Sequence, residues 1–278
     1  MTWLPRSTPQ PLRPYRYPSR RFPLLAMALA ALALAFLPAC QQASGPSQAA
    51  ASGEAASQSD SLADPSRSDD DRKRDQGFKP LEVYSFFDVQ PGLTVADLWP
   101  GRGYHTQILS KVVGQEGEIL AVMGPLYYGS SYADRAREAL GERIEAGKLE
   151  NVRIVDQLED LSPDSIDVMI TVRNYHDLGG APERTAVLPA LMKALKPGGI
   201  LGVVDAYTPK EGVDEDNHRM NEELAIAEFT ANGFELVERS DILANPDDTY
   251  EFDGREDDAP IHRYFIHRFV HKYRKPVE

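Results

Sequence analysis

Cysteine is almost absent from this 278-residue chain, in which Cys40 is the only one. Without a second cysteine, no disulfide can form within the chain. Long apolar runs are also scarce, and the one clear example lies near the N-terminus, at residues 24–37. Fold and function therefore depend on a core without covalent cross-links and on side chains other than thiols.

The first 40 residues are rich in arginine and contain no acidic residue. A basic segment, a short apolar run and the small residues before Cys40 are typical of a secretory signal peptide, and the run is too short to span a bilayer comfortably. Residues 37–40, Leu-Pro-Ala-Cys, resemble a bacterial lipobox. This resemblance implies that Cys40 is lipidated and becomes the first mature residue. A plain anchor helix with an incidental cysteine is the alternative.

The residue after the lipobox is Gln41 and not Asp, which by analogy favours the outer membrane. We therefore expect a lipid-anchored, periplasm-facing protein of the bacterial cell envelope. Residues 19–22, Ser-Arg-Arg-Phe, hint at a twin-arginine signal, but Pro23 interrupts that pattern, so the export route stays open. With Cys40 lipidated no thiol remains, which excludes metal sites that use cysteine.

Basic residues are in deficit in the rest of the chain. The full chain has 30 Lys and Arg against 43 Asp and Glu, and removal of the five leader arginines changes the net charge from −13 to −18. Such a surface repels phosphate backbones, and no basic stripe offsets it. We therefore expect no nucleic-acid partner and a small-molecule or envelope substrate instead.

Residues 41–75 consist mostly of Ala, Ser, Gln, Gly and Asp, without aromatic residues. Such a segment buries too little apolar surface to offset its ordering entropy, so we expect a flexible tether. Residues 76–278 then form one domain of roughly 200 residues, an ordinary size for a single core.

Within this domain, apolar runs alternate with helical patterns, which predicts an α/β fold with a parallel sheet and crossover helices. A long acidic connection over residues 245–260 is expected to be mobile. Helices are expected at 81–87, 106–113, 131–146, 182–195 and 221–232, and strands at 94–98, 118–123, 152–155, 165–172, 200–204, 234–240 and 264–273. The last two strands are expected to form an antiparallel edge pair.

The most informative motif is the apolar run of residues 95–98, which contains Asp97 and is followed by Trp99, Pro100 and the Gly-x-Gly of Gly101 and Gly103. An acid at a strand tip followed by a glycine turn that opens a helix suits a nucleoside-bearing ligand, because the glycines allow close approach of the backbone. The motif resembles the first motif of class I S-adenosylmethionine-dependent methyltransferases, Asp/Glu-x-Gly-x-Gly-x-Gly. It departs from that motif at Trp99, where the family usually has its first glycine.

The resemblance extends over residues 76–276, and includes the Lys-Pro-Gly-Gly of residues 196–199 before the fifth strand. It implies a doubly wound, mostly parallel seven-stranded sheet of the Rossmann-like methyltransferase type. It also implies S-adenosylmethionine as cofactor, with Asp97, Gly101 and Gly103 around its amino-acid end and Trp99 and Arg102 in the same loop. A dinucleotide-binding motif fits less well, because its third glycine would fall on Thr106.

Two further strand tips carry expected cofactor contacts. The family has an acid after the second strand, where a carboxylate accepts both ribose hydroxyls; here the residue is Met123. The ribose would then be held by backbone, by Tyr127 or by Tyr128, or the pocket has changed its ligand. After the third strand, the resemblance places an adenine contact at Asp156 or Gln157.

The fourth strand is followed by Arg173-Asn174-Tyr175-His176-Asp177. This segment resembles a Tyr/Leu-His-Asp signature of a group of predicted bacterial methyltransferases. His176 suits a general base because the ordinary pKa of histidine is near neutral, with Asp177 or Asp205 orienting it, and Asn174 is a candidate cofactor contact. A hydrogen-bonded cap of the following helix is the alternative role of His176.

The remaining histidines favour no metal site. His218 and Arg219 precede a helix, where they either cap it or anchor an anionic substrate. His267 and His271 share a face of the last strand, but an edge strand is a poor metal site, and His105 is expected to pack in the first crossover helix. We therefore expect no metal ion.

Two functions of different kinds follow from these patterns. The first is an envelope methyltransferase with an unknown acceptor. The second is a non-catalytic binding module on a degenerate methyltransferase scaffold, which Trp99 and Met123 favour because both depart from the family pattern. A general base that faces a nucleoside-sized cleft favours the enzyme, whereas a cleft filled by Trp99 favours the module. A dehydrogenase is a third and weaker alternative.

Overall fold

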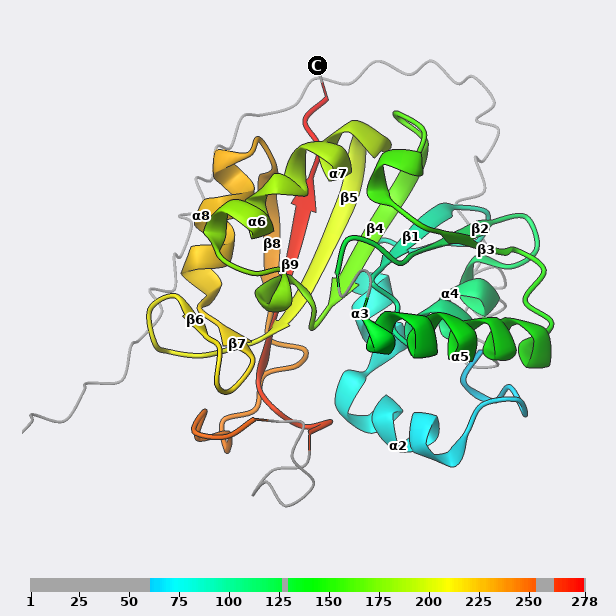
Figure 1. The fold of residues 1–278 in the computed structure, drawn as a ribbon, viewed down its shortest axis with the longest axis horizontal. Coiled ribbons are helices and arrows are strands. Elements are labelled where there is room, and N and C mark those ends of the chain that lie inside the picture. The colour runs from blue at the N-terminus through cyan, green and yellow to red at the C-terminus, as the bar shows by residue number, and fades with distance from the viewer. Residues whose placement is uncertain (1–60, 127–129, 254–262, 278) are drawn as a thin grey trace, which may run out of the picture. The chain divides into compact units, whose positions relative to one another are not determined.

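The structure is a computed structural model that describes residues 61–126, 130–253 and 263–277. Its centre is a seven-stranded sheet with the order β3-β2-β1-β4-β5-β9-β8 (Figure 1). The strands of this sheet are β1 (Thr94–Leu98), β2 (Glu118–Val122), β3 (Val152–Val155), β4 (Ile166–Val172), β5 (Leu195–Ala206), β8 (Glu235–Ser240) and β9 (Arg268–Arg274). Two short strands, β6 (Val213–Asp214) and β7 (Arg219–Met220), pair separately as an antiparallel ribbon.

The first five strands of the sheet run parallel, and β9 pairs antiparallel with both β5 and β8. This arrangement confirms the predicted fold class, including the antiparallel pair at one edge. The strand order reverses at β1, which pairs with β2 on one side and β4 on the other. In open α/β sheets, this reversal opens a crevice outside the carboxyl ends of the two diverging strands.

Helices and apolar clusters lie on both faces of the sheet. The helices are α2 (Asp69–Phe78), α3 (Pro80–Phe86), α4 (Tyr104–Val113), α5 (Ser131–Gly147), α6 (Ala181–Ala186), α7 (Leu188–Ala194) and α8 (Glu222–Ala231), with two short 3₁₀ turns, η1 (Leu158–Asp160) and η2 (Tyr175–Asp177). Neighbouring residues of β1 serve different clusters: Val95 packs with Ile108 of α4, and Ala96 packs in the cluster of Leu188 from α7. Successive side chains of a strand point to opposite faces, so a continuous apolar run is buried on both sides.

Two elements differ from the sequence-based expectation between residues 181 and 206. The expected single helix is broken at Val187, because Pro189 lies in the first turn of α7 and has no N–H group to continue α6. Strand β5 begins at Leu195, five residues before the expected start. The Pro-Gly-Gly segment stays in the sheet because Gly198 N donates to Lys275 O at 3.0 Å, and Lys275 N donates to Gly199 O at 2.9 Å.

The expected tether is wrong for residues 61–75, which pack on the domain. Arg67 is 4% exposed and forms a bidentate ion pair with Asp75, in which the two guanidinium nitrogens lie 2.9 and 2.5 Å from the two carboxylate oxygens. Ser68 caps α2 by accepting a hydrogen bond from Asp71 N. Composition alone missed this segment because ion pairs and a helix cap, and not apolar runs, hold it. Residues 1–60, with the expected signal peptide, the rest of the tether and Cys40, lie outside the described residues.

The acidic connection after β8 also differs from the mobile loop expected there. In its described part, residues 245–253, the Asp248 carboxylate pairs with Arg219 at 2.9 and 3.1 Å, and both side chains are fully buried. Residues 254–260 lie outside the described part of the chain. Over the described residues, no helix combines the length and the apolar character that a membrane span requires.

Candidate functional site

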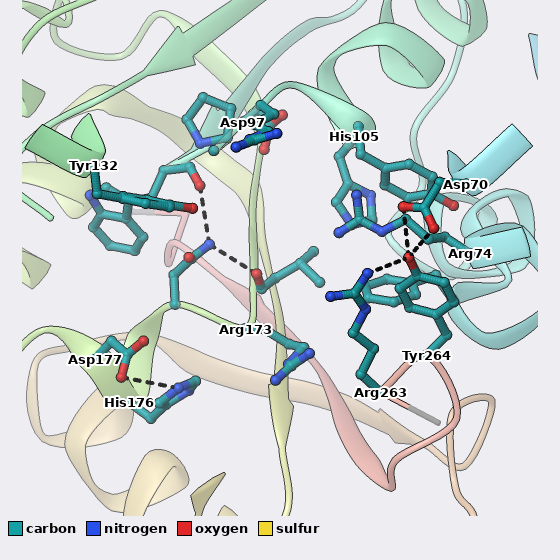
Figure 2. Close-up of a pocket in the computed structure, with 18 of the residues that line it drawn as sticks. Asp70, Arg74, Asp97, His105, Tyr132, Arg173, His176, Asp177, Arg263 and Tyr264 are labelled. Atoms are coloured by element: carbon teal, nitrogen blue, oxygen red, sulfur yellow. Dashed lines mark hydrogen bonds and ion pairs between the residues drawn. The ribbon is translucent and has the colours of Figure 1, made fainter. Parts of the chain in front are cut away.

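A cleft of about 760 Å³ opens at the carboxyl ends of β1 and β4, at the point where the strand order reverses (Figure 2). Its lining includes seven residues that the sequence analysis selected: Asp97, Trp99, Gly101, Arg102, Asn174, His176 and Asp177. Figure 2 shows Asp97 apart from the His176–Asp177 pair, on another side of the cleft. The two walls therefore come from different strands and carry different chemistry.

The turn after β1 is built from left-handed backbone. Trp99, Gly101 and Gly103 have φ values of 57°, 55° and 81°. A Cβ on Gly103 would lie 2.5 Å from Leu140 Cδ1, so this glycine is required for the packing of α4 against α5 and does not line the cleft. A Cβ on Gly101 would meet only the Tyr132 hydroxyl, at 3.7 Å. Gly101 therefore leaves backbone accessible to a ligand.

Asp97 is the carboxyl group of this wall, and it is 2% exposed. The Thr106 hydroxyl donates to it at 2.6 Å, and among the described residues no basic side chain lies within ion-pair distance. Burial raises the pKa of Asp97 to about 7, although the hydrogen bonds from Thr106 oppose this rise. In the described part of the chain, Asp97 is thus a buried acid without a cation beside it, and a cationic ligand group would favour its ionised form.

Trp99 lines the cleft and does not fill it. Its backbone N donates to Val122 O at 2.8 Å, and its indole Nε1 donates to Gly124 O at 3.0 Å. These two bonds hold the side chain against the segment that follows β2. A cleft of about 760 Å³ remains beside it.

Three expected cofactor contacts, Met123, Asp156 and Gln157, do not line the described cleft. Met123 N donates to Val155 O at 2.9 Å, and the exposed Asp156 carboxylate pairs with Arg137. These residues follow β2 and β3, and the segment after β2 is the one to which Trp99 is bonded through Gly124 O. Tyr127 and Tyr128, the alternative ribose contacts, lie outside the described residues.

The second wall centres on His176, which is 5% exposed in η2. Asp205 of β5 accepts from the backbone N of His176 at 3.0 Å, and its other oxygen lies 2.6 Å from His176 Nδ1. Asp177 Oδ1 lies 3.3 Å from His176 Nε2. Both carboxylates expected to orient His176 therefore contact it. Burial lowers the pKa of this imidazole, but the nearby charges of Asp205 and Asp177 outweigh burial and raise it to about 9.

Asn174 connects the two walls. Its Nδ2 donates to Val172 O at 2.9 Å and to Trp99 O at 3.2 Å. The side chain therefore fixes the tip of β4 against the turn after β1. This role stabilises the floor of the cleft whether or not a cofactor also contacts the amide.

Neither expected role of the segment His218-Arg219 matches the structure. Asn221 caps α8 by accepting from Glu223 N and Leu224 N, so His218 is not the cap. Arg219 is buried against Asp248, which leaves it unable to anchor a substrate. His218 Nδ1 instead lies 2.7 Å from Oδ1 of the cleft residue Asp177, although His218 itself is not part of the described lining.

Several cleft residues were missed by the sequence analysis. His105, expected to pack in a helix, does lie in α4 and its Nδ1 is 2.6 Å from the Tyr84 hydroxyl, yet it also lines the cleft. Burial lowers the pKa of His105 to about 3, so its ring is neutral. The others belong to α2, to the segments around Tyr132 and Arg173, and to the segment before β9: Asp70, Arg74, Tyr132, Arg173, Arg263 and Tyr264. The Tyr264 hydroxyl donates to Asp70 at 2.7 Å, a contact between segments 194 positions apart that no local pattern could signal.

The fold is similar to that of solved structures of other proteins. No protein-family model and no curated protein matches the chain. A solved S-adenosylmethionine-dependent methyltransferase from Aquifex aeolicus matches with a TM-score of 0.54 and 19% identity, over 72% of this chain and 92% of that one. The [4+2]-cyclase SpnF also matches with a TM-score of 0.54, at 14% identity, over 72% of this chain and 81% of that one. The chain thus has the fold of class I S-adenosylmethionine-dependent methyltransferases.

Proposed function

We propose that this protein is an S-adenosylmethionine-dependent methyltransferase of the bacterial cell envelope. The observation that carries the proposal is the cleft between β1 and β4, which is lined on one side by Asp97, a buried acid without a cation among the described residues, and on another side by His176 and Asp177. The fold of the Aquifex aeolicus methyltransferase supports this proposal. Neither that fold nor the SpnF cyclase decides between activities, because one scaffold hosts several functions.

On the β1 wall, the residues fit the charged end of this cofactor. Asp97 would pair with its ammonium group, which stabilises the ionised carboxylate in a buried place. The backbone at Gly101 and the neighbouring Arg102 would contact its carboxylate end, since Gly101 leaves open space. S-adenosylmethionine supplies a methyl group already activated by its sulfonium, so the protein mainly orients the reactants and removes a proton.

On the second wall, His176 and Asp177 would contact the methyl acceptor and accept the proton that it loses. With a pKa of about 9, His176 is charged at neutral pH in the unliganded protein. It acts as a base only after losing the proton from Nε2, and Asp177 Oδ1 lies 3.3 Å from that nitrogen. The pair therefore holds a single transferable proton next to the acceptor side of the cleft.

Lipidation of Cys40 would tether the enzyme to the membrane, with its folded domain facing the periplasm. Gln41, the residue after Cys40, favours the outer membrane. The net charge of −18 after removal of the leader argues against a nucleic-acid acceptor. A small molecule or an envelope component of unknown identity is the acceptor that fits these conditions.

A non-catalytic binding module is the second candidate function. The hydrogen bond from Trp99 Nε1 to Gly124 O favours it, because this bond holds the indole at the cleft against the segment that follows β2. The absence of a ribose acid at Met123 favours it as well. A ligand smaller than S-adenosylmethionine would then occupy the cleft.

Calorimetric titration of the purified full chain with S-adenosylmethionine and S-adenosylhomocysteine separates these candidates, with NAD as the control. We expect micromolar binding of the first two, roughly −8 kcal/mol, and none of NAD. Absence of binding for both sulfur ligands would contradict the methyltransferase and support the module. Binding of NAD alone would favour a dehydrogenase.

A further inference from the structure

Two imidazoles converge on one carboxylate oxygen at the acceptor side of the cleft. Asp177 Oδ1 lies 3.3 Å from His176 Nε2 and 2.7 Å from His218 Nδ1. The ligand atoms of these three residues all lie within 4.8 Å of one another. Over the described part of the chain, this is the one group of three His, Cys, Asp or Glu side chains that converges in this way.

The two separations from Asp177 Oδ1 are close to those between neighbouring ligands of a small divalent cation. Two ligand atoms at tetrahedral positions around Zn²⁺ are about 3.3 Å apart, given metal–ligand distances near 2.0–2.1 Å. The His176–Asp177 separation already has this value, and the His218–Asp177 separation is shorter by a fraction of an ångström. The His218 side chain is 24% exposed, so its ring has room to make this adjustment.

The surroundings of His176 orient its ring for coordination. Asp205, which is fully buried, engages Nδ1 at 2.6 Å and the backbone N of the same residue at 3.0 Å. A carboxylate on one imidazole nitrogen fixes the tautomer and directs the other nitrogen toward a metal, as in carboxylate–histidine–zinc arrangements. Nε2 of His176 is then the nitrogen that faces Asp177.

We propose that His176 Nε2, Asp177 Oδ1 and His218 Nδ1 bind one divalent transition-metal ion. Two imidazoles and a carboxylate suit Zn²⁺, Co²⁺ or Mn²⁺ better than Mg²⁺, which prefers oxygen ligands. On binding, any proton on a coordinating nitrogen leaves to solvent from a charged ring or moves to the other nitrogen of a neutral ring, and three new metal–ligand bonds replace the two contacts to Asp177. This proposal departs from the sequence-based expectation of no metal, in which His218 either capped a helix or anchored an anionic substrate.

An open coordination position of this ion would face the cleft, because His176 and Asp177 line it. If the proposed methyltransferase activity holds, on which this step rests, the acceptor is a molecule with a hydroxyl or carboxylate oxygen that completes the coordination. A divalent cation lowers the pKa of a bound hydroxyl. The metal would then make the acceptor nucleophilic without using His176 as a base.

Metal binding is tested on the purified full chain after removal of metal with a chelator. Titration with Zn²⁺ is expected to give one equivalent bound with micromolar or tighter affinity. The Co²⁺ form is expected to show visible absorption that changes on addition of azide, which reports an open coordination position. His218→Ala and Asp177→Asn are expected to weaken Zn²⁺ binding at least tenfold, and Asp205→Asn to weaken it 10–100-fold through loss of orientation.

His267→Gln is the matched control, because His267 lies on another part of the chain, next to Tyr250, and this variant should bind Zn²⁺ like wild type. His218 is the most exposed of the three proposed ligands, so its variant is the least disruptive to folding, and circular dichroism of each variant verifies the fold. Failure of wild type to bind one equivalent, or binding by His218→Ala with unchanged affinity, would overturn the proposal. These measurements require no S-adenosylmethionine. If the protein proved to have no methyltransferase activity, the result on metal binding would therefore still stand.

Discussion

The two walls of the cleft bury carboxylates with opposite consequences. On the β1 wall, Asp97 has a hydroxyl partner, Thr106, and burial raises the pKa of this carboxyl to about 7. On the second wall, which lies after β4 and is called the β4–β5 wall below because Asp205 belongs to β5, Asp205 and Asp177 flank His176. Their charges raise the pKa of the imidazole to about 9 despite its burial. Asp97 and Asp205 are both almost fully buried, so the two walls differ in the neighbouring side chain, which is a hydroxyl beside Asp97 and an imidazole beside Asp205. Among the described residues, the first wall therefore has no cation beside its carboxyl group, whereas the second places an imidazole between two carboxyl groups.

This contrast predicts a division of labour, with ligand affinity on the β1 wall and turnover on the β4–β5 wall. His176→Ala should lower transfer of labelled methyl groups from S-adenosylmethionine into an envelope extract by at least about 100-fold, the size of a lost proton-transfer or positioning group. The dissociation constant for S-adenosylmethionine should stay within a few-fold, since His176 lies on the other wall. Turnover that survives this change would mean that His176 is structural.

The two glycines of the turn after β1 have different roles: Gly103 allows helix packing, whereas Gly101 leaves space for a ligand. Gly103→Ala should lower the free energy of unfolding by about 3 kcal/mol, because its Cβ meets the buried Leu140 and the backbone is left-handed. Gly101→Ala should cost only about 1 kcal/mol, from backbone strain alone. Chemical denaturation measures both.

Ligand titration of the same pair sharpens the contrast. Affinity for S-adenosylmethionine should fall in Gly101→Ala, whose Cβ enters the cleft, and persist in folded Gly103→Ala, which lies outside the lining. The reverse pattern would show that Gly101 does not face the ligand.

The pH dependence of ligand binding tests the charge of the β1 wall. Asp97 is protonated below its pKa of about 7, so a cationic ligand must first displace that proton. Affinity for S-adenosylmethionine should therefore rise about tenfold between pH 5.5 and 7, and Asp97→Asn should bind weakly with a flat profile. A wild-type affinity that does not change with pH would exclude Asp97 from the cationic end of the ligand.

The free energy of unfolding should also depend on the titration of Asp97, but it should fall as pH rises, whereas ligand affinity should increase. Because the pKa of Asp97 is raised in the folded state, its contribution to stability is present below its ordinary value of 3.8 and is lost as pH rises to about 7. Asp97→Asn should remove this component from the pH profile of the unfolding midpoint in urea. A component that persists in the variant would belong to another group.

The regular part of the fold was predictable because local signals are strong there. The strands at 94–98 and 152–155 have the predicted bounds, since each is a short apolar or β-branched run between turn residues. The first crossover helix begins at Tyr104, two residues earlier than predicted, because Gly103 is its cap. Strand tips follow directly from strand positions, which explains why Asp97 and His176 were found.

The rest of the site depends on how long connections return to the sheet, which periodicity does not report. His218 meets Asp177 across 41 positions, and Arg219 is neutralised by Asp248 across 29. Helix α2 contributes cleft residues although its segment lacks the apolar pattern of a core element. In each case polar contacts between distant segments decide the geometry.

Trp99 offers the smallest and most discriminating change. Trp99→Phe removes the bond from the indole to Gly124 O and should lower the free energy of unfolding by about 1 kcal/mol. If the indole is only a wall, affinity for S-adenosylmethionine stays within a few-fold; if it blocks the way to the ends of β2 and β3, affinity rises tenfold or more. The chain has two tryptophans, and Trp3 lies in the expected leader, so fluorescence of the mature protein reports Trp99 alone. Quenching on titration of the mature wild-type protein would place the ligand beside the indole, and unchanged emission with calorimetric binding would place it elsewhere in the cleft.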